Sequence, residues 1–315
     1  MKEIVIDGKK ILPGEKVQIN ALIARLPTRT PINIPVFVAR SKVDGPTLLV
    51  MAGMHGDETN GVAIVRDIIR KKYNIPKRGT IICIPVFNVF GYLEQSREFP
   101  DGRDLNRMFP GSKTGSLASQ FAYKFTKDIM PLVDYVIDYH TGGAERENYP
   151  NVRCLLKEEK TLELAKVFGA PFIVQSKYIA KSIREAFKKK GKTILLFEGG
   201  KSLNLDQEVI DCGVEGALNV MKHLNIQDGD IEHVYKAVTV TKSKWVRAAH
   251  SGMFQASVKN GAHVERRAVI GKITDPYGKF EKNVLAPNDC YIFGLNTAPI
   301  VYKGDAIFHV SVETI

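Results

Sequence analysis

Cysteine is scarce in this sequence, with four residues among 315, at positions 83, 154, 212 and 290. None of them forms a C-x-x-C pair, and a chain of this length does not need disulfide bonds to be stable. This argues against a cysteine-based metal site and favours a reducing compartment. Long apolar runs are also absent, since no stretch approaches the ~20 residues that cross a bilayer. Residues 1–10 mix charged with apolar residues, unlike a secretory signal, so we expect a cytoplasmic protein with no membrane partner.

The composition excludes fibrous, coiled-coil and disordered proteins. Hydrophobic residues make up 44% and charged residues 25%, as in an ordinary soluble globular protein. The formal net charge is +11, but Lys and Arg are scattered and the longest run is three lysines at 188–190. A solvated basic surface explains this pattern better than a nucleic-acid footprint, so we expect no nucleic-acid partner. The charge weakly favours anionic small substrates.

Strand-like and helix-like segments alternate from residue 47 to residue 224. Apolar runs typical of buried strands occur at 47–52, 80–86, 134–139, 172–175 and 193–197. Helical spacing occurs at 61–73, 116–130, 162–168, 182–190 and 206–224. This alternation predicts an α/β fold with a mixed, mostly parallel sheet flanked by helices on both faces.

The chain changes character after about residue 235. Glycine and proline there separate short β-branched runs, and apolar residues repeat with a spacing of 37, as in Phe254 and Tyr291 or Ile270 and Ile307. Two similar β units facing each other would bury both apolar faces. We therefore predict two domains, an α/β domain at 1–235 and a smaller all-β sandwich or barrel-like domain at 236–315.

Two histidines and a glutamate stand at predicted strand ends. His55 and Glu58 follow one strand in the sequence A-G-M-H-G-D-E-T-N-G, and His140 ends another in D-Y-H-T-G-G. Ligands bind at the carboxyl edge of open α/β sheets, so these side chains are expected to meet there. Two His and one Glu are a ligand set of catalytic zinc, which leaves a fourth position for water. Taken alone, the first motif could be a surface His and Glu without a metal. The second could be a histidine that caps the strand end through a hydrogen bond.

A Gly/Pro-rich loop, R-D-L-N-R-M-F-P-G, begins at Arg103. Arg107 can hold a carboxylate through two parallel hydrogen bonds, and Asn106 can donate another. The preceding Arg97 could polarise a carbonyl and stabilise its oxyanion. The alternative is that ion pairs, such as one between Arg103 and Asp104, only stabilise this loop.

A fourth motif, L-L-F-E-G-G, places Glu198 at the end of a buried strand. Beside a metal-bound water, this carboxylate could accept a proton and pass it to a leaving nitrogen. A capping or salt-bridged Glu is the alternative.

Together these motifs resemble the succinylglutamate desuccinylase/aspartoacylase family, which is related to the zinc carboxypeptidases. The H-G-D-E, D-L-N-R-x-F-P-G, D-Y-H and E-G-G stretches occur in the expected order over residues 45–225. The combination is specific, although each motif alone is weak. The resemblance implies a zinc-carboxypeptidase-like α/β fold and a C-terminal β domain similar to that of the family.

The resemblance also implies roles for individual residues. One Zn²⁺ per chain would be bound by His55, Glu58 and His140. Glu198 would be the general acid/base, and Asn106 and Arg107 would bind a substrate carboxylate. Arg97 is the first candidate for the arginine that polarises the carbonyl. Arg103 is the second, because the spacing from Arg97 to the N-R pair is longer than in aspartoacylase.

We therefore expect a zinc-dependent amidohydrolase that deacylates an N-acyl amino acid or a related small N-acyl compound carrying a carboxylate. A metallocarboxypeptidase acting on peptides is one alternative, because it would use the same metal and base. A carrier module is another, with a modified lysine at Lys279 or Lys282, but neither D-K-A nor M-K-M surrounds them and no lipoylation is predicted. Whether the chain forms a homo-oligomer is left open.

Overall fold

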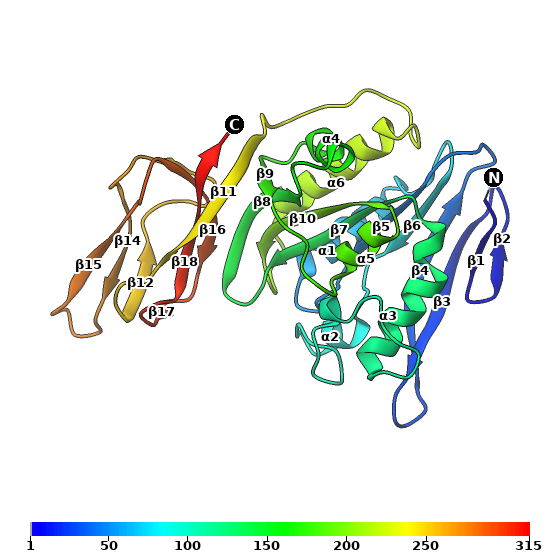
Figure 1. The fold of residues 1–315 in the computed structure, drawn as a ribbon, viewed down its shortest axis with the longest axis horizontal. Helices are drawn as coiled ribbons and strands as arrows, with labels where there is room; N and C mark the ends of the chain where they lie inside the picture. Colours follow the sequence, from blue (N-terminus) through cyan, green and yellow to red (C-terminus); the bar gives the residue numbers. More distant parts are fainter. Residues whose placement is uncertain (1) are drawn as a thin grey trace.

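The computed structural model describes residues 2–315, and twelve of the described strands form one continuous sheet (Figure 1). Their order is β13-β16-β18-β11-β9-β8-β10-β7-β5-β6-β4-β3. The central strands are β9 (Phe172–Gln175), β8 (Arg146–Cys154), β10 (Thr193–Lys201), β7 (Tyr135–Gly142), β5 (Thr47–Ala52) and β6 (Thr80–Ile84). At the N-terminal side lie β4 (Pro31–Arg40) and β3 (Lys16–Arg25), with a separate hairpin of β1 (Ile4–Ile6) and β2 (Lys9–Ile11).

Helices cover both faces of the central strands, which is why β5 and β6 are apolar on both sides. All residues of β5 and β6 are buried. On one face, the core includes α1 (Thr59–Arg70), α4 (Glu159–Phe168) and α6 (Gln207–His223). On the other, it includes α3 (Leu117–Asp128), α5 (Ile183–Lys189) and the short helix η2 (Met130–Leu132), near α2 (Val89–Leu93) and η1 (Leu105–Arg107). The predicted α/β architecture is thus confirmed.

The sheet is mixed, as predicted, but the expectation that it is mostly parallel is not confirmed, because many of its strand pairs are antiparallel. Parallel pairing joins β10–β7, β7–β5, β5–β6 and β8–β9, whereas β8–β10, β4–β6 and β3–β4 are antiparallel. Strand β8 was not predicted from the sequence R-E-N-Y-P-N-V-R-C, which is polar and contains Pro150. Its insertion beside β10 reverses the local strand direction.

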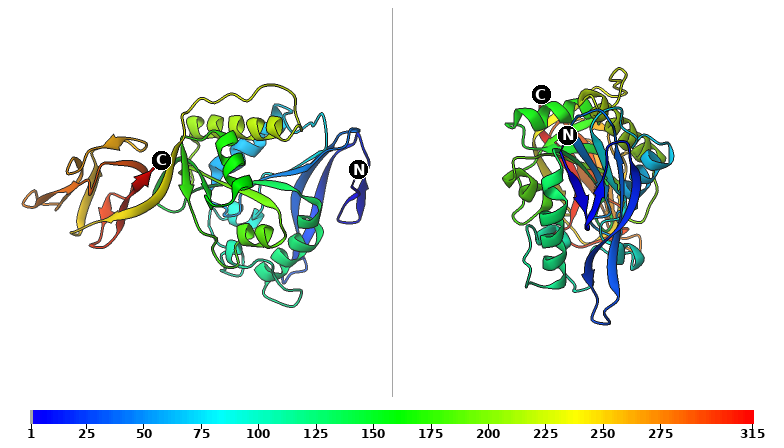
Figure 2. Two further views of the ribbon diagram at one scale, coloured as in Figure 1. Left: turned by 45° about the horizontal axis from the view of Figure 1, so that its top comes forward. Right: turned by 90° about the vertical axis from the view of Figure 1, so that its right-hand side faces the viewer.

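The C-terminal region is rich in strands, as predicted, and forms a lobe at one end of the molecule (Figures 1 and 2). Its strands are β11 (Val238–Arg247), β12 (Gly252–Ala256), β13 (His263–Val264), β14 (Val269–Thr274), β15 (Glu281–Leu285), β16 (Cys290–Asn296), β17 (Ile300–Val301) and β18 (Ala306–Thr314). Strands β17 and β18 begin 37 residues after β13 and β14, as the sequence repeat predicts. The two halves exchange strands, because β12 pairs with β17 and β16 pairs with β13.

The C-terminal lobe continues the main sheet. Strand β11 pairs in parallel with β9, and β16 pairs antiparallel with β8. Within residues 2–315, no helix has both the length and the apolar character that a membrane span requires.

Candidate metal centre and its cavity

His55, Glu58 and His140 lie together at the carboxyl edge of the sheet. His55 and Glu58 occupy the turn between β5 and α1, and His140 belongs to the adjacent parallel strand β7. Their potential ligand atoms all lie within 4.8 Å of one another, and the residues are only 2%, 2% and 4% exposed. The turn is tight at Gly56, where a Cβ would come 1.7 Å from the carbonyl carbon of Gly91.

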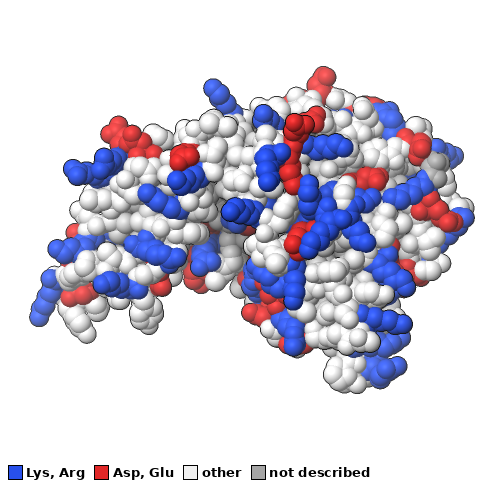
Figure 3. All heavy atoms as spheres, viewed as in Figure 1, with Lys and Arg blue, Asp and Glu red and all other residues white. Residues whose placement is uncertain are grey.

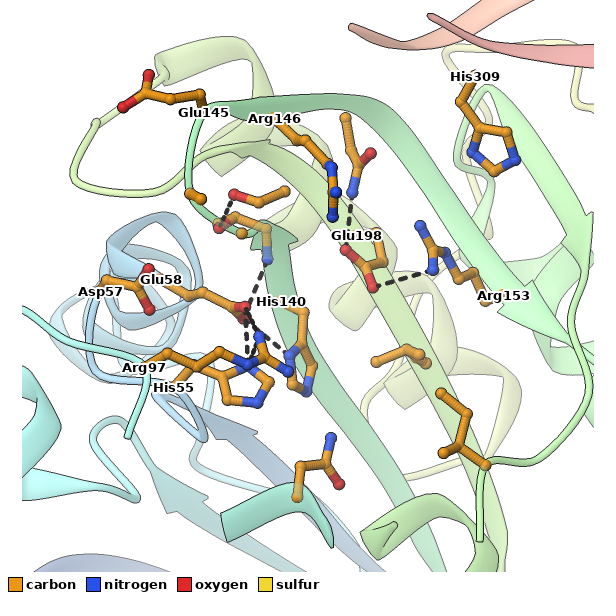
Figure 4. A pocket seen from close by; sticks show the side chains of 18 of the residues that line it. His55, Asp57, Glu58, Arg97, His140, Glu145, Arg146, Arg153, Glu198 and His309 are labelled. Atoms are coloured by element: carbon orange, nitrogen blue, oxygen red, sulfur yellow. Dashed lines mark hydrogen bonds and ion pairs between the residues drawn. The ribbon is translucent and has the colours of Figure 1, made fainter. Parts of the chain in front are cut away.

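The two imidazoles point the same ring nitrogen at Glu58 (Figure 4). The Nδ1 atoms of His55 and His140 each lie 2.8 Å from an oxygen of the Glu58 carboxylate. Each Nε2 atom lies beside another carboxylate, at 3.2 Å from Asp104 for His55 and at 3.0 Å from Asp138 for His140. A carboxylate behind each imidazole fixes the ring and directs its Nδ1 toward Glu58, where a metal ion would be held. This nitrogen and oxygen donor set fits a metal site of the zinc type.

The charges in this cluster shift the pKa values of its members. Burial raises the pKa of Glu58, but the two imidazoles outweigh burial and hold it well below its ordinary value. Burial lowers the pKa of His140, yet Asp138 and Glu58 raise it well above the ordinary value. The carboxylates around the two imidazoles thus favour positive charge at the centre of the cluster, which fits the binding of a divalent cation there.

Arg97 borders the cluster and Arg103 does not. The guanidinium of Arg97 lies 3.2 Å from His55 Nδ1 and 3.6 Å from Glu58, and donates a hydrogen bond of 2.9 Å to Asp104. Arg103 is half-exposed, forms an ion pair with Asp101, and is absent from the lining of the adjacent cavity. Of the two arginine candidates, the structure places only Arg97 beside the predicted ligands.

Asn106 and Arg107 line the same cavity from the short helix η1. Asp104 caps this helix by accepting a hydrogen bond from the Asn106 backbone N–H at 2.8 Å. The Asn106 side-chain oxygen accepts a hydrogen bond from the Ile183 N–H at 3.0 Å, so its amide N–H groups remain available to a ligand. Arg107 lies 3.9 Å from Asp104 and is partly exposed.

Glu198 lies next to His140, because parallel pairing of β10 and β7 places these two residues opposite each other. The carboxylate accepts a hydrogen bond of 2.8 Å from the Asn148 amide and lies 3.5 Å from the Arg153 guanidinium (Figure 4). Both partners come from β8. The unpredicted strand thus supplies the groups that hold Glu198.

A cavity of about 790 Å³ joins the three candidate ligands to Arg97, Asn106, Arg107 and Glu198, and the C-terminal lobe forms part of its wall. Trp245, Ile300 and His309 line it from β11, β17 and β18. The Trp245 and His309 rings stack at 4.6 Å, and the Arg146 guanidinium lies 5.5 Å from the Trp245 ring centre.

On the molecular face shown in Figure 3, basic side chains are interspersed with acidic ones.

Several residues in the cavity wall or beside the candidate ligands were not given a functional role from the sequence. Asp104 and Asp138 lie inside the quoted motifs, where a carboxylate close to a histidine was the available signal. Asn148 and Arg153 lie on the unrecognised strand β8, and Arg184, on α5, gave no signal.

The fold and the His55–Glu58–His140 cluster together define an α/β protein with a candidate metal centre at the edge of its sheet. The family model described as the succinylglutamate desuccinylase/aspartoacylase catalytic domain matches residues 44–224. The chain therefore belongs to the succinylglutamate desuccinylase/aspartoacylase family.

Relatives of known name and structure agree with this assignment. The N-alpha-acetyl-L-2,4-diaminobutyric acid deacetylase of Halomonas elongata is 28% identical over 257 residues, which cover 78% of this chain and 75% of that protein. A succinylglutamate desuccinylase/aspartoacylase structure from Rhodobacter sphaeroides matches with a TM-score of 0.83 and 24% identity, covering 94% of this chain and 95% of that one. The product-bound ectoine utilization protein EutE (DoeB) from Ruegeria pomeroyi matches with a TM-score of 0.84 and 21% identity, covering 99% and 98%. The structural likenesses show a shared fold, and the relative from Halomonas elongata is named as a deacetylase.

Proposed function

We propose that this protein is a zinc-dependent amidohydrolase that removes the acyl group from an N-acyl amino acid or a related small N-acyl compound. The observation that supports this most directly is the position of Glu198. It lies in register with His140, in the cavity that also contains His55 and Glu58. The deacetylase from Halomonas elongata adds support, because its name describes cleavage of an N-acetyl amino acid.

The proposed chemistry divides between binding and proton transfer. Zinc held by His55, Glu58 and His140 would lower the pKa of a bound water to about 7. Glu198 would accept a proton from water and deliver it to the leaving amine nitrogen. The Arg97 guanidinium would polarise the amide carbonyl and stabilise the negative charge that develops on its oxygen.

The substrate would be small and would carry a carboxylate. Asn106 and Arg107 offer N–H donors for that carboxylate at the cavity wall.

We also propose that residues 1–235 and 236–315 are two domains, with the second limiting the size of the substrate through Trp245 and Ile300. A cytoplasmic location is part of the proposal, because all four cysteines are free and buried.

Metal removal and Glu198→Gln test this proposal. Stripping the metal with a chelator should abolish deacylation of acetyl-, succinyl- and other N-acyl amino acids, and zinc should restore it. Glu198→Gln should still bind zinc but should lose turnover by at least about 100-fold. Deacylation that survives complete metal removal, or full activity in Glu198→Gln, would contradict the proposal.

A further inference from the structure

Arg184 is a buried cation in the wall of the cavity. It lies in the first turn of α5, is 7% exposed and lines the cavity that contains Glu198. Within residues 2–315, no carboxylate oxygen lies within 4.0 Å of its guanidinium. Buried charges in proteins are normally paired, since an unpaired one loses hydration without compensation.

Neutral groups hold the Arg184 side chain in place. Its guanidinium donates hydrogen bonds to the Ser176 hydroxyl, at 3.2 Å, and to the Ser176 carbonyl oxygen, and stacks 4.7 Å from the Tyr178 ring centre. These two bonds use two of the five N–H groups of an arginine. The nearby Glu158 carboxylate is engaged instead by Lys188 at 2.7 Å and by the Tyr178 hydroxyl at 2.5 Å.

Among the other arginines that line the cavity, three lie within 4.0 Å of a carboxylate, and Arg146 is exposed to solvent. Arg97 pairs with Asp104 at 2.9 Å, and Arg153 pairs with Glu198 at 3.5 Å. Arg107, the residue predicted to bind a carboxylate, already lies 3.9 Å from Asp104. Burial lowers the pKa of Arg184, and the Arg153 charge lowers it too. Together they outweigh the opposing effects of Tyr178, Cys154 and Glu158, so an incoming anion would relieve an electrostatic cost here.

We propose that Arg184 is the main charged anchor for the substrate carboxylate, which supplies the missing counter-ion. The Ile183 N–H that bonds Asn106 fixes the start of α5 against η1, so Arg184 and the Asn106–Arg107 pair form one wall. Arg184 therefore selects ligands that carry a carboxylate over otherwise identical neutral ligands. The identity of the ligand rests on the proposed function, but the carboxylate preference can be measured by binding alone.

The test compares an acid with its amide. Zinc-loaded protein with the Glu198→Gln substitution would be titrated calorimetrically with Nα-acetyl-L-2,4-diaminobutyrate and with its carboxamide. The acid should bind about 10- to 100-fold more tightly, the range expected for hydrogen bonds to a charged group. Adding Arg184→Gln should reduce this ratio to about one, whereas Arg107→Gln should keep most of it. Arg78→Gln, at a surface pair with Asp228, is the matched control.

A charge-conserving variant covers the case in which Arg184→Gln does not fold. Arg184→Lys keeps the cation but loses the planar fork, so it should weaken binding of the acid severalfold and leave binding of the carboxamide unchanged. Three results would overturn the proposal. The preference for the acid over its carboxamide could survive Arg184→Gln, could disappear only in Arg107→Gln, or could be unaltered in Arg184→Lys.

A separate deacylation assay on the wild-type protein distinguishes this proposal from the proposed function. Absence of turnover together with an Arg184-dependent preference would remove the deacylase function and leave the carboxylate site. Turnover together with a carboxylate preference that does not depend on Arg184 would support the deacylase function and rule out the Arg184 site.

Discussion

Each imidazole of the candidate metal centre is oriented by a carboxylate behind it. Asp138 lies 3.0 Å from His140 Nε2 and is 1% exposed, so it would act on a bound metal through the histidine. Such partners hold the ring and increase its basicity as a ligand. Sequence analysis placed the three ligands from their residue types and strand-end positions. It assigned no role to Asp138, because the direction of a ring nitrogen depends on tertiary packing.

Asp138→Asn should preserve the shape of the site and weaken zinc binding by about 10- to 100-fold. The affinity can be measured by competition with a chromogenic chelator. Asp228→Asn, at an exposed position paired with Arg78, serves as the control and should bind zinc like the wild type. Equal affinities for Asp138→Asn and the wild type would show that Asp138 does not support the metal site.

His309 predicts a specific dependence of stability on pH. Burial, with a smaller effect of the Arg153 charge, lowers its pKa to about 3, against an ordinary value of 6.5. Between these two pKa values, His309 binds a proton in the unfolded chain but not in the folded chain. The neutral His309 therefore contributes fully to the free energy of unfolding above pH 6.5, and this contribution decreases as the pH falls toward 3.

His309→Gln should therefore lose less stability than the wild type on acidification. The difference between the two proteins should change by up to about 1.4 kcal/mol per pH unit in that window. Urea unfolding at several pH values, with both proteins measured in parallel, isolates this group from the other histidines. Parallel pH curves for the two proteins would contradict a neutral, buried His309.

At the scale of elements, the turn between β5 and α1 sets the geometry of the metal centre. A Cβ on Gly56 would come 1.7 Å from backbone of the neighbouring segment at Gly91, which cannot move like a side chain. Gly56→Ala should therefore destabilise the protein by about 3 kcal/mol or more and reduce zinc content. Denaturant unfolding and metal analysis measure both effects. Gly143→Ala is the matched control, because the nearest atom to its Cβ would be 3.6 Å away.

The elements differ in how far their sequences determine them. Strand β5 was predicted with the same bounds as observed, because an apolar run buried on both faces has one strong explanation. Strand β8 was missed, because Asn148 and Arg153 are polar residues that line the cavity or bond Glu198 and do not enter a hydrophobic core. Strand direction depends on pairing partners distant in sequence, so the antiparallel β8–β10 pair could not be anticipated.

At the scale of the whole molecule, the C-terminal lobe forms part of the cavity wall. Trp245 and Ile300 come from this lobe and line the same cavity as Asn106 and Arg107. The sequence indicated a separate β region through its repeat. Its contribution to the cavity follows from the pairing of β16 with β8, which no local pattern encodes.

The lobe should discriminate against long substrates. We expect an acetylated amino acid to be cleaved at least about tenfold faster than an acylated dipeptide at equal low concentrations. Trp245→Ala should reduce this ratio by widening the cavity, whereas Trp245→Phe should keep most of it. Comparing kcat/KM for both substrates in the three proteins provides the measurement. Equal or better cleavage of the dipeptide by the wild type would favour the peptidase alternative.

The exchange of strands between the two halves of the C-terminal lobe has a consequence for cooperativity. Because β12 pairs with β17 and β16 with β13, either half in isolation would expose unpaired strand edges and the apolar residues that the other half covers. Neither half is therefore an independent folding unit, in spite of the internal duplication. The lobe must gain or lose its structure as a whole, and the cavity wall that it supplies is present or absent with it.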